Sequence, residues 1–173
     1  MLAFYKQLTT AQFEAALATL GHCIDRCPEA AWDAPVAELK FCQVVHHTLF
    51  FTDLYLDQGD EAFRAQPFHA EHASYFRDYE ELEPQRQTHL YDRSTTVAYL
   101  QHCREKAIAQ IEAETEASLA AGAANPWIKF TRAELHLYNL RHVQHHAAQL
   151  SLRLRLDHGV DIPWVASGWH DCD

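Results

Sequence analysis

Glycine and proline are scarce in this sequence: its 173 residues include 5 glycines and 6 prolines. Because both residues interrupt helices, their scarcity favours long helices.

Basic residues are also few, with 14 Lys and Arg against 24 Asp and Glu, which gives a formal net charge of -10. A nucleic-acid partner requires a basic surface, so we expect none. No apolar run approaches the length that spans a membrane, so we expect no membrane partner either.

Cysteine is present in an odd number, and no CxxC pair occurs. A secreted disulfide framework is therefore not indicated. The N-terminal stretch Met1–Lys6 is not followed by the long apolar run of a signal peptide. We expect a cytoplasmic protein whose thiols serve mainly as small core residues. The five cysteines are Cys23, Cys27, Cys42, Cys103 and Cys172.

Apolar residues make up 48% of the chain, enough to build the core of one domain over residues 1–173. Thr9 or Thr10 can cap a first helix, Asp92 a third, and Thr131 a fourth, with Glu134 completing a capping box. We predict an all-α, four-helix bundle. Its helices are expected at about residues 9–27, 38–56, 92–121 and 131–157.

A long connection, residues 60–91, separates the second and third predicted helices. It is rich in acids and aromatics, and a connection of this length is usually functional or partly helical. A short helix is expected near residues 70–82, with His69 and His72 as loop residues. On the third helix, Glu105, Glu112, Glu114 and Glu116 are expected to form a solvated face.

Histidine is unusually frequent, with 13 residues, so position must decide which of them matter. His142 and His146 are four residues apart and therefore share one helix face, a spacing that lets two imidazoles reach one metal ion. His47 lies in the apolar second helix, where a polar ring needs a partner. We predict that these three side chains bind a divalent metal. The adjacent His46 points about 100° away, towards the edge of the site or the surface.

Two motifs carry a resemblance to a known family. Gln43-Val44-Val45-His46-His47 and the later His142-x-x-x-His146-x-x-Gln149-Leu150 are similar to motifs of the DinB/YfiT-like superfamily. Further agreement comes from the runs 32–35, 91–92, 98–100 and 162–164. The resemblance covers most of the chain, but only the three histidines are specific. Ala147-Ala148 stands where many relatives carry Arg-Gly, which leaves the ligands in place but removes that arginine.

The resemblance implies a four-helix bundle, often a homodimer, that binds zinc, nickel or a similar ion through His47, His142 and His146. It also implies transfer onto a low-molecular-weight thiol, such as bacillithiol, mycothiol or glutathione, as co-substrate beside a second small-molecule substrate. Two alternatives stay open. One is a metal-dependent hydrolase, for which Asp53 and His145 are the candidate bases. The other is a non-catalytic metal-binding stress protein.

Overall fold

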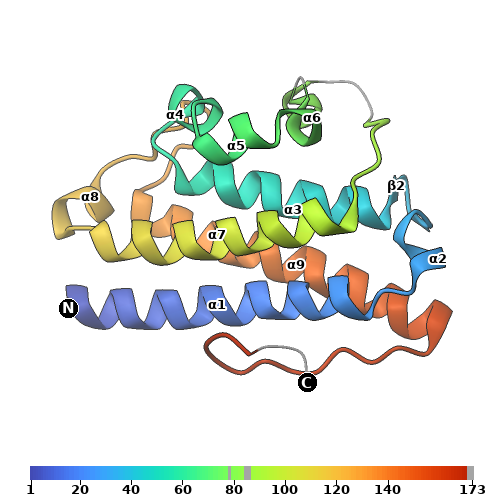
Figure 1. Ribbon diagram of the computed structural model, residues 1–173. Coiled ribbons are helices and arrows are strands. Elements are labelled where there is room, and N and C mark those ends of the chain that lie inside the picture. Colours follow the sequence, from blue (N-terminus) through green and yellow to red (C-terminus); the bar gives the residue numbers. More distant parts are fainter. Residues whose placement is uncertain (78, 84–86, 171–173) are drawn as a thin grey trace.

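A computed structural model of the protein describes residues 1–77, 79–83 and 87–170. Helices α1 and α3 each pack against both α7 and α9, which closes a bundle around one core (Figure 1). This arrangement confirms the predicted all-α four-helix bundle and brings α3 beside α9. The four long helices are α1 (Leu2–Arg26), α3 (Phe41–Leu56), α7 (Arg93–Ala113) and α9 (Arg132–His158).

Helix α3 is the central element of the bundle. Of its 16 residues, only His47 and Phe51 are not fully buried. A helix that is apolar almost all round is stable only inside such a bundle, because burial of its side chains supplies the driving force. The fully buried side chains around it come from all four helices and include Phe13, Leu17, Leu20, Leu49, Leu54, Tyr99, Ile111, Val143 and Leu150.

Helix α1 begins earlier than predicted. Thr9 is not a cap but a buried residue inside the helix, which starts at Leu2. The Tyr5 hydroxyl donates a hydrogen bond to the Ala133 carbonyl oxygen at 3.1 Å. The N-terminal turns of α1 therefore pack against the start of α9, and this tertiary contact extends the helix.

A small hairpin precedes α3, where the sequence predicted a helix from residue 38. The segment after α1 forms the one-turn helix α2 (Glu29–Trp32), then strands β1 (Pro35–Val36) and β2 (Leu39–Lys40). The strands are antiparallel, with Val36 opposite Leu39. Helix α3 starts only at Phe41, where the Gln43 side-chain oxygen accepts from the Lys40 backbone N–H at 2.9 Å.

Helix α7 ends at Ala113, and a separate short helix α8 (Glu116–Ala120) replaces the predicted continuation to residue 121. Glu114, expected on a solvated face, is buried and bonded to Arg132 at 2.8 Å and to His136 at 2.9 Å. These contacts with α9 draw Glu114 inwards in an extended conformation, so that α7 cannot continue. The Thr115 hydroxyl then caps α8.

Two predicted helix starts are confirmed by their hydrogen bonds. The Asp92 carboxylate accepts from the Thr95 N–H at 2.8 Å at the start of α7. The Thr131 hydroxyl accepts from the Glu134 N–H at 3.3 Å at the start of α9. Both side chains satisfy backbone donors that the first helical turn leaves without a partner.

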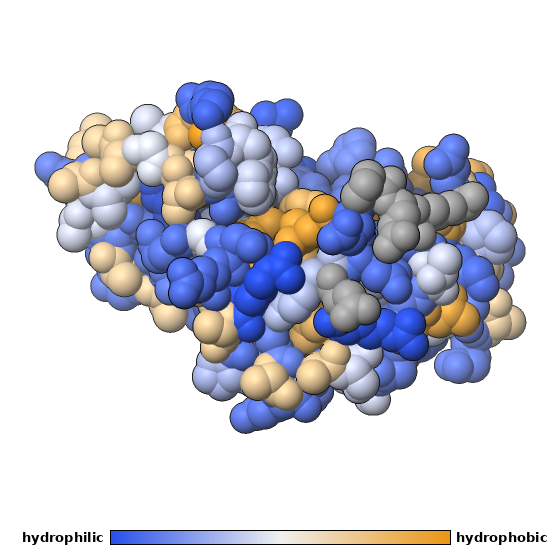
Figure 2. Space-filling view, turned by 90° about the horizontal axis from the view of Figure 1, so that it is seen from above, coloured by the Kyte–Doolittle hydropathy of each residue, from blue (hydrophilic) through white to orange (hydrophobic). Residues whose placement is uncertain are grey.

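The long connection lies over α3 (Figure 1), and its described residues form four short helical segments. The single helix predicted near residues 70–82 is broken, because Arg77 and Tyr79 have φ angles of 46° and 57°. The buried aromatic side chains Phe63 and Phe76 face the core. The outer surface on this side is mostly hydrophilic, with a hydrophobic area near its middle (Figure 2). The helices are α4 (Asp60–Arg64), α5 (Pro67–Glu71), α6 (Ala73–Phe76) and the 3-10 turn η1 (Glu80–Leu82).

Two further expectations concern the membrane and the cysteines. Among the described helices, none combines the length and apolarity needed to cross a membrane. Four cysteines are buried thiols, as expected for core residues: Cys23, Cys27, Cys42 and Cys103. Burial raises the pKa of Cys27 and of Cys42 to about 11, so neither is a ready nucleophile. Cys172 lies outside the described residues.

Candidate metal centre

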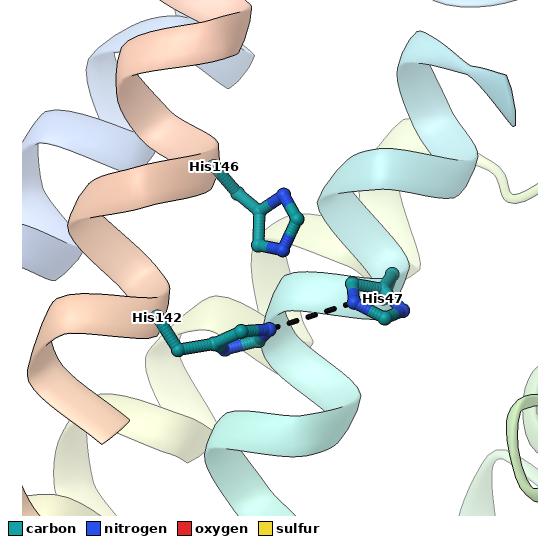
Figure 3. Close-up of side chains that lie close together, drawn as sticks. All are labelled: His47, His142 and His146. Carbon is teal, nitrogen blue, oxygen red and sulfur yellow. Dashed lines mark hydrogen bonds between the residues drawn. The ribbon is translucent and has the colours of Figure 1, made fainter. Parts of the chain in front are cut away.

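His47, on α3, and His142 and His146, on α9, point toward one another between the two helices (Figure 3). Nε2 of His47 lies 3.5 Å from Nε2 of His142. One ring nitrogen of each histidine lies within 4.8 Å of the other two. Nitrogens bound to one zinc ion lie roughly 3–4 Å apart, because each Zn–N bond is about 2.0–2.1 Å. We call these three residues the histidine triad. Small movements of their side chains would bring the three nitrogens to the separation that one bound ion requires.

The local structure explains why these rings converge. His47 and Phe51 form the one partly exposed line along α3, and this line faces α9. His142 and His146 are one helical turn apart on α9, with ring centroids 4.7 Å from each other. The His47 ring is 5.4 Å from the His142 ring and 4.9 Å from the His146 ring. The i, i+4 spacing read from the sequence thus becomes a cluster of three imidazoles.

The outer nitrogens of two triad rings have defined partners. Nδ1 of His47 lies 2.9 Å from a carboxylate oxygen of Glu81, and Nδ1 of His146 lies 2.9 Å from the side-chain oxygen of Gln149. Both oxygens only accept, so each Nδ1 carries the hydrogen and each Nε2 keeps its lone pair. This tautomer directs the two Nε2 atoms into the cluster as ligands. An outer partner of this kind is typical of histidines that bind metals.

The third ring, His142, is held mainly by packing. Its Nδ1 is buried and has no hydrogen-bond partner in the part of the chain that the structure describes. The rings of Phe51 and Tyr55 lie 6.0 and 6.2 Å from it, and Tyr138 packs against Tyr55 at 5.4 Å. These three aromatic residues pack along one side of His142.

The electrostatics keep two rings of the triad neutral. Burial and, to a smaller extent, the nearby His146 and His47 rings lower the pKa of His142 to about 3. Burial likewise lowers the pKa of His146 to about 4, with His47 as the next contribution. At pH 7 both rings are therefore neutral, which is the state that binds metal ions.

Glu81 belongs to this site, although sequence reasoning missed it. Its side chain is 4% exposed, and it lies 2.9 Å from His47, 3.4 Å from His46 and within hydrogen-bond reach of Gln87. Burial alone would raise its pKa, but the hydrogen bonds from His46 and His47 lower it to about 2. Glu81 is therefore a carboxylate that supports His47 from the connection. No local signal marked it, because an acid in an acid-rich connection is usually solvated.

His46 lies at the edge of the site rather than at the surface. It is 2% exposed and stacks on Tyr91, with ring centroids 3.6 Å apart. Its Nδ1 shares the Glu81 carboxylate with His47. Burial lowers the pKa of His46. The helix turns this ring towards the connection and α7, while His47 faces α9.

The two candidate bases lie in different surroundings. Asp53 is completely buried, and its carboxylate bonds to His69 at 2.9 Å, to the Tyr99 hydroxyl at 2.9 Å and to the Lys106 ammonium group. All three partners lie outside the triad. His69, expected in a loop, is a buried residue of α5 that joins the connection to Asp53. The structure therefore gives Asp53 a tertiary ion-pair network instead of a place beside the triad.

His145 is exposed and adjoins the triad. Its Nε2 accepts a hydrogen bond from the Gln149 side-chain amide at 3.1 Å, and the same amide group accepts from His146. The His145 and His146 rings lie 5.0 Å apart. His145 therefore connects to the triad through Gln149, at its solvent side.

These features define a helical-bundle protein with a three-histidine cluster suited to a divalent metal. A comparison with protein-family models matches residues 12–150 to the DinB superfamily. The match covers most of the chain, so the protein belongs to the DinB superfamily. Searches of curated proteins and of solved structures gave no significant match. The resemblance seen in the two histidine motifs is thus confirmed at the level of the superfamily.

Proposed function

We propose that the protein binds a divalent metal ion through His47, His142 and His146, and that it joins a low-molecular-weight thiol to an electrophilic small molecule. The observation that carries this proposal is the convergence of three ring nitrogens, on histidines of which two are oriented by Glu81 and Gln149. Three imidazoles suit zinc or nickel, and a site with three protein ligands keeps a position open for substrate.

A divalent ion in such a site supplies a Lewis acid that lowers the pKa of a thiol, so that the reactive thiolate forms near neutral pH. The chain's own residues orient and protect this chemistry. Glu81 and Gln149 hold the protons on the outer nitrogens of His47 and His146. On one side of the site, Phe51 and Tyr55 pack against the His142 ring and Tyr138 packs against Tyr55.

With a chlorinated aromatic acceptor the reaction balances without a further reactant. The thiol sulfur forms a bond to the ring carbon, and the carbon–chlorine bond breaks. Chloride leaves with the bonding electron pair, and the thiol proton passes to solvent. Dispersal of that proton needs no buried base, and the exposed His145 adjoins the triad on its solvent side.

The hydrolase alternative requires a base that activates water. Asp53 is an unsuitable base, because its carboxylate already accepts from His69, Tyr99 and Lys106 in the core. His145 remains the candidate for that reaction.

The thiol co-substrate and the homodimer are both implied by the resemblance and remain proposals. Exposed apolar side chains such as Phe4 and Leu8 on α1 are compatible with a dimer contact.

The first experiment measures metal content after gel filtration, by elemental analysis. We expect the wild type to retain zinc or nickel, and the variants His47→Ala and His146→Ala to lose most of it. The matched control is His145→Ala, which changes an exposed histidine next to a ligand. Equal retention in His47→Ala and in the wild type would reject the metal site.

The second experiment measures conjugation of 1-chloro-2,4-dinitrobenzene to glutathione, bacillithiol or mycothiol, with metal-loaded and metal-free protein. We expect one thiol to react faster with the loaded protein, and the His47→Ala variant to lose this acceleration. A loaded protein that accelerates none of the three reactions would reject the transferase and leave the hydrolase or the non-catalytic protein.

A further inference from the structure

A groove opens beside the histidine triad, between the β1–β2 hairpin, α3 and α9. Its volume is about 630 Å³, which falls within the roughly 300–1,000 Å³ of pockets that bind small molecules. His47 and His146 form part of its lining, so the groove is continuous with the triad. A molecule bound in this groove would reach the reacting centre directly.

The lining of the groove is mainly apolar. The hairpin contributes Val36 and Leu39, α3 contributes Val44, and α9 contributes Leu152. Leu152 is 55% exposed, so a bound ligand would remove part of its apolar surface from water. These side chains favour an apolar ligand, because binding removes their surface from water.

The charges around the groove do not favour an anion. Apart from the two histidines, the ionisable residues that line it are Glu38 and Arg153. The Arg153 guanidinium already forms an ion pair with Asp157, one turn further along α9. In the metal-free groove two carboxylates therefore accompany one cation, and its side chains offer a negatively charged ligand no net positive charge.

We propose that this groove binds the electrophilic substrate, and that this substrate is an uncharged, mainly apolar small molecule such as an activated aromatic compound. That the ligand is an electrophile rests on the proposed transferase function. Its uncharged and apolar character follows from the lining of the groove alone. The hairpin and Leu152 then set the size of the acceptor. The thiol approaches from outside the groove, at the open position of the triad.

The test is a binding titration with 1,3-dinitrobenzene, an uncharged aromatic probe that has no leaving group and cannot react. Calorimetry is performed on metal-loaded and on metal-free protein, without any thiol. We expect the wild type to bind the probe and the variant Leu152→Glu to bind it at least about ten-fold more weakly, a change of about 1.4 kcal/mol. The matched control is Leu156→Glu, because Leu156 is 66% exposed one turn away and outside the groove lining described here. Metal content should be the same in both variants.

Three outcomes would overturn the inference: no binding to the wild type, equal affinity in Leu152→Glu and the wild type, or equal weakening in the two variants. Binding of 3,5-dinitrobenzoate to the metal-free protein as tight as that of 1,3-dinitrobenzene would reject the uncharged class. The titration is independent of turnover. Intact probe binding without transferase activity would therefore reject the proposed function while the groove assignment holds.

Discussion

A carboxylate oxygen of Glu81 lies 2.9 Å from Nδ1 of His47. The two residues come from different layers of the structure, since Glu81 belongs to the 3-10 turn η1 and His47 to the central helix α3. The contact fixes the tautomer of His47 and turns its Nε2 towards His142 and His146. It also gives the connection over α3 a direct role in the candidate metal centre.

The first prediction follows from this contact. Glu81→Ala should lower the affinity for zinc or nickel roughly 10–100-fold, because His47 loses the partner that orients it. Glu81→Gln should cause a smaller loss, since its amide oxygen still accepts from Nδ1 of His47. Competition with a chelating dye measures both affinities. The control is Glu80→Ala, which removes the preceding carboxylate. An unchanged affinity in Glu81→Ala would show that the connection does not support the site.

Periodicity and caps predicted the bundle and placed His142 and His146 on one helix face. The side chains of Asp92 and Thr131 cap their helices through local hydrogen bonds, which depend on sequence neighbours alone. The i, i+4 spacing of His142 and His146 is likewise local. His47 was identifiable because a polar ring in an apolar helix needs a partner. The superfamily resemblance added the pairing between the two helices.

Contacts between distant segments could not be predicted in the same way. Glu114 has the pattern of a solvated residue, yet Arg132 and His136 bury it and end α7. His69 has the pattern of a loop residue, yet Asp53 binds it inside the core. Glu81 reaches His47 across 34 positions of the chain. In each case the partner's position depends on the finished fold, so no local pattern reveals it.

The second prediction concerns pH. The pKa of His142 is about 3 and that of His146 about 4 in the folded, metal-free protein, against about 6.5 in an unfolded chain. Between about pH 6.5 and pH 4 the unfolded chain therefore binds more protons, and folding stability falls as the pH falls. Above pH 6.5 both states are neutral, and the contribution is fully present.

Urea unfolding of the metal-free protein at about pH 7 and pH 5 measures this loss of stability. We expect His142→Gln to lose less stability than the wild type between the two pH values, because glutamine does not take up a proton. Part of the pH dependence should remain, since burial also lowers the pKa values of His46 and His136. An identical loss in His142→Gln and the wild type would contradict the assignment.

The third prediction separates Asp53 from the metal centre. Asp53→Asn should destabilise the protein by about 3 kcal/mol, because it removes the buried negative charge that Lys106 and His69 share. Lys106 keeps its second carboxylate partner, Asp57. Metal content should not change, since Asp53 bonds to His69, Tyr99 and Lys106, which all lie outside the triad. The control is Asp60→Asn, which removes an exposed ion pair with Arg64 and should cost at most about 1 kcal/mol. Metal loss in a folded Asp53→Asn protein would instead connect Asp53 to the site.

The last prediction concerns Arg132, which joins three parts of the bundle. It is 4% exposed; its guanidinium donates to the Tyr55 carbonyl oxygen at 3.0 Å, to that of Leu56 at 2.8 Å and to the Glu114 carboxylate at 2.8 Å. Arg132 thus satisfies carbonyl groups at the C-terminal end of α3 that have no partner within the helix.

Replacing Arg132 by Met should lower the free energy of unfolding by about 3–5 kcal/mol, because Glu114 stays buried without its cation and the end of α3 loses its donors. The control is Arg155→Met, which removes an exposed ion pair with Asp161 and should cost at most about 1 kcal/mol. The double variant Arg132→Met, Glu114→Gln should be more stable than the sum of the two single changes predicts, since the unpaired charge is then gone. Simple additivity in urea unfolding would show that the charge of Glu114 is not what makes Arg132 necessary.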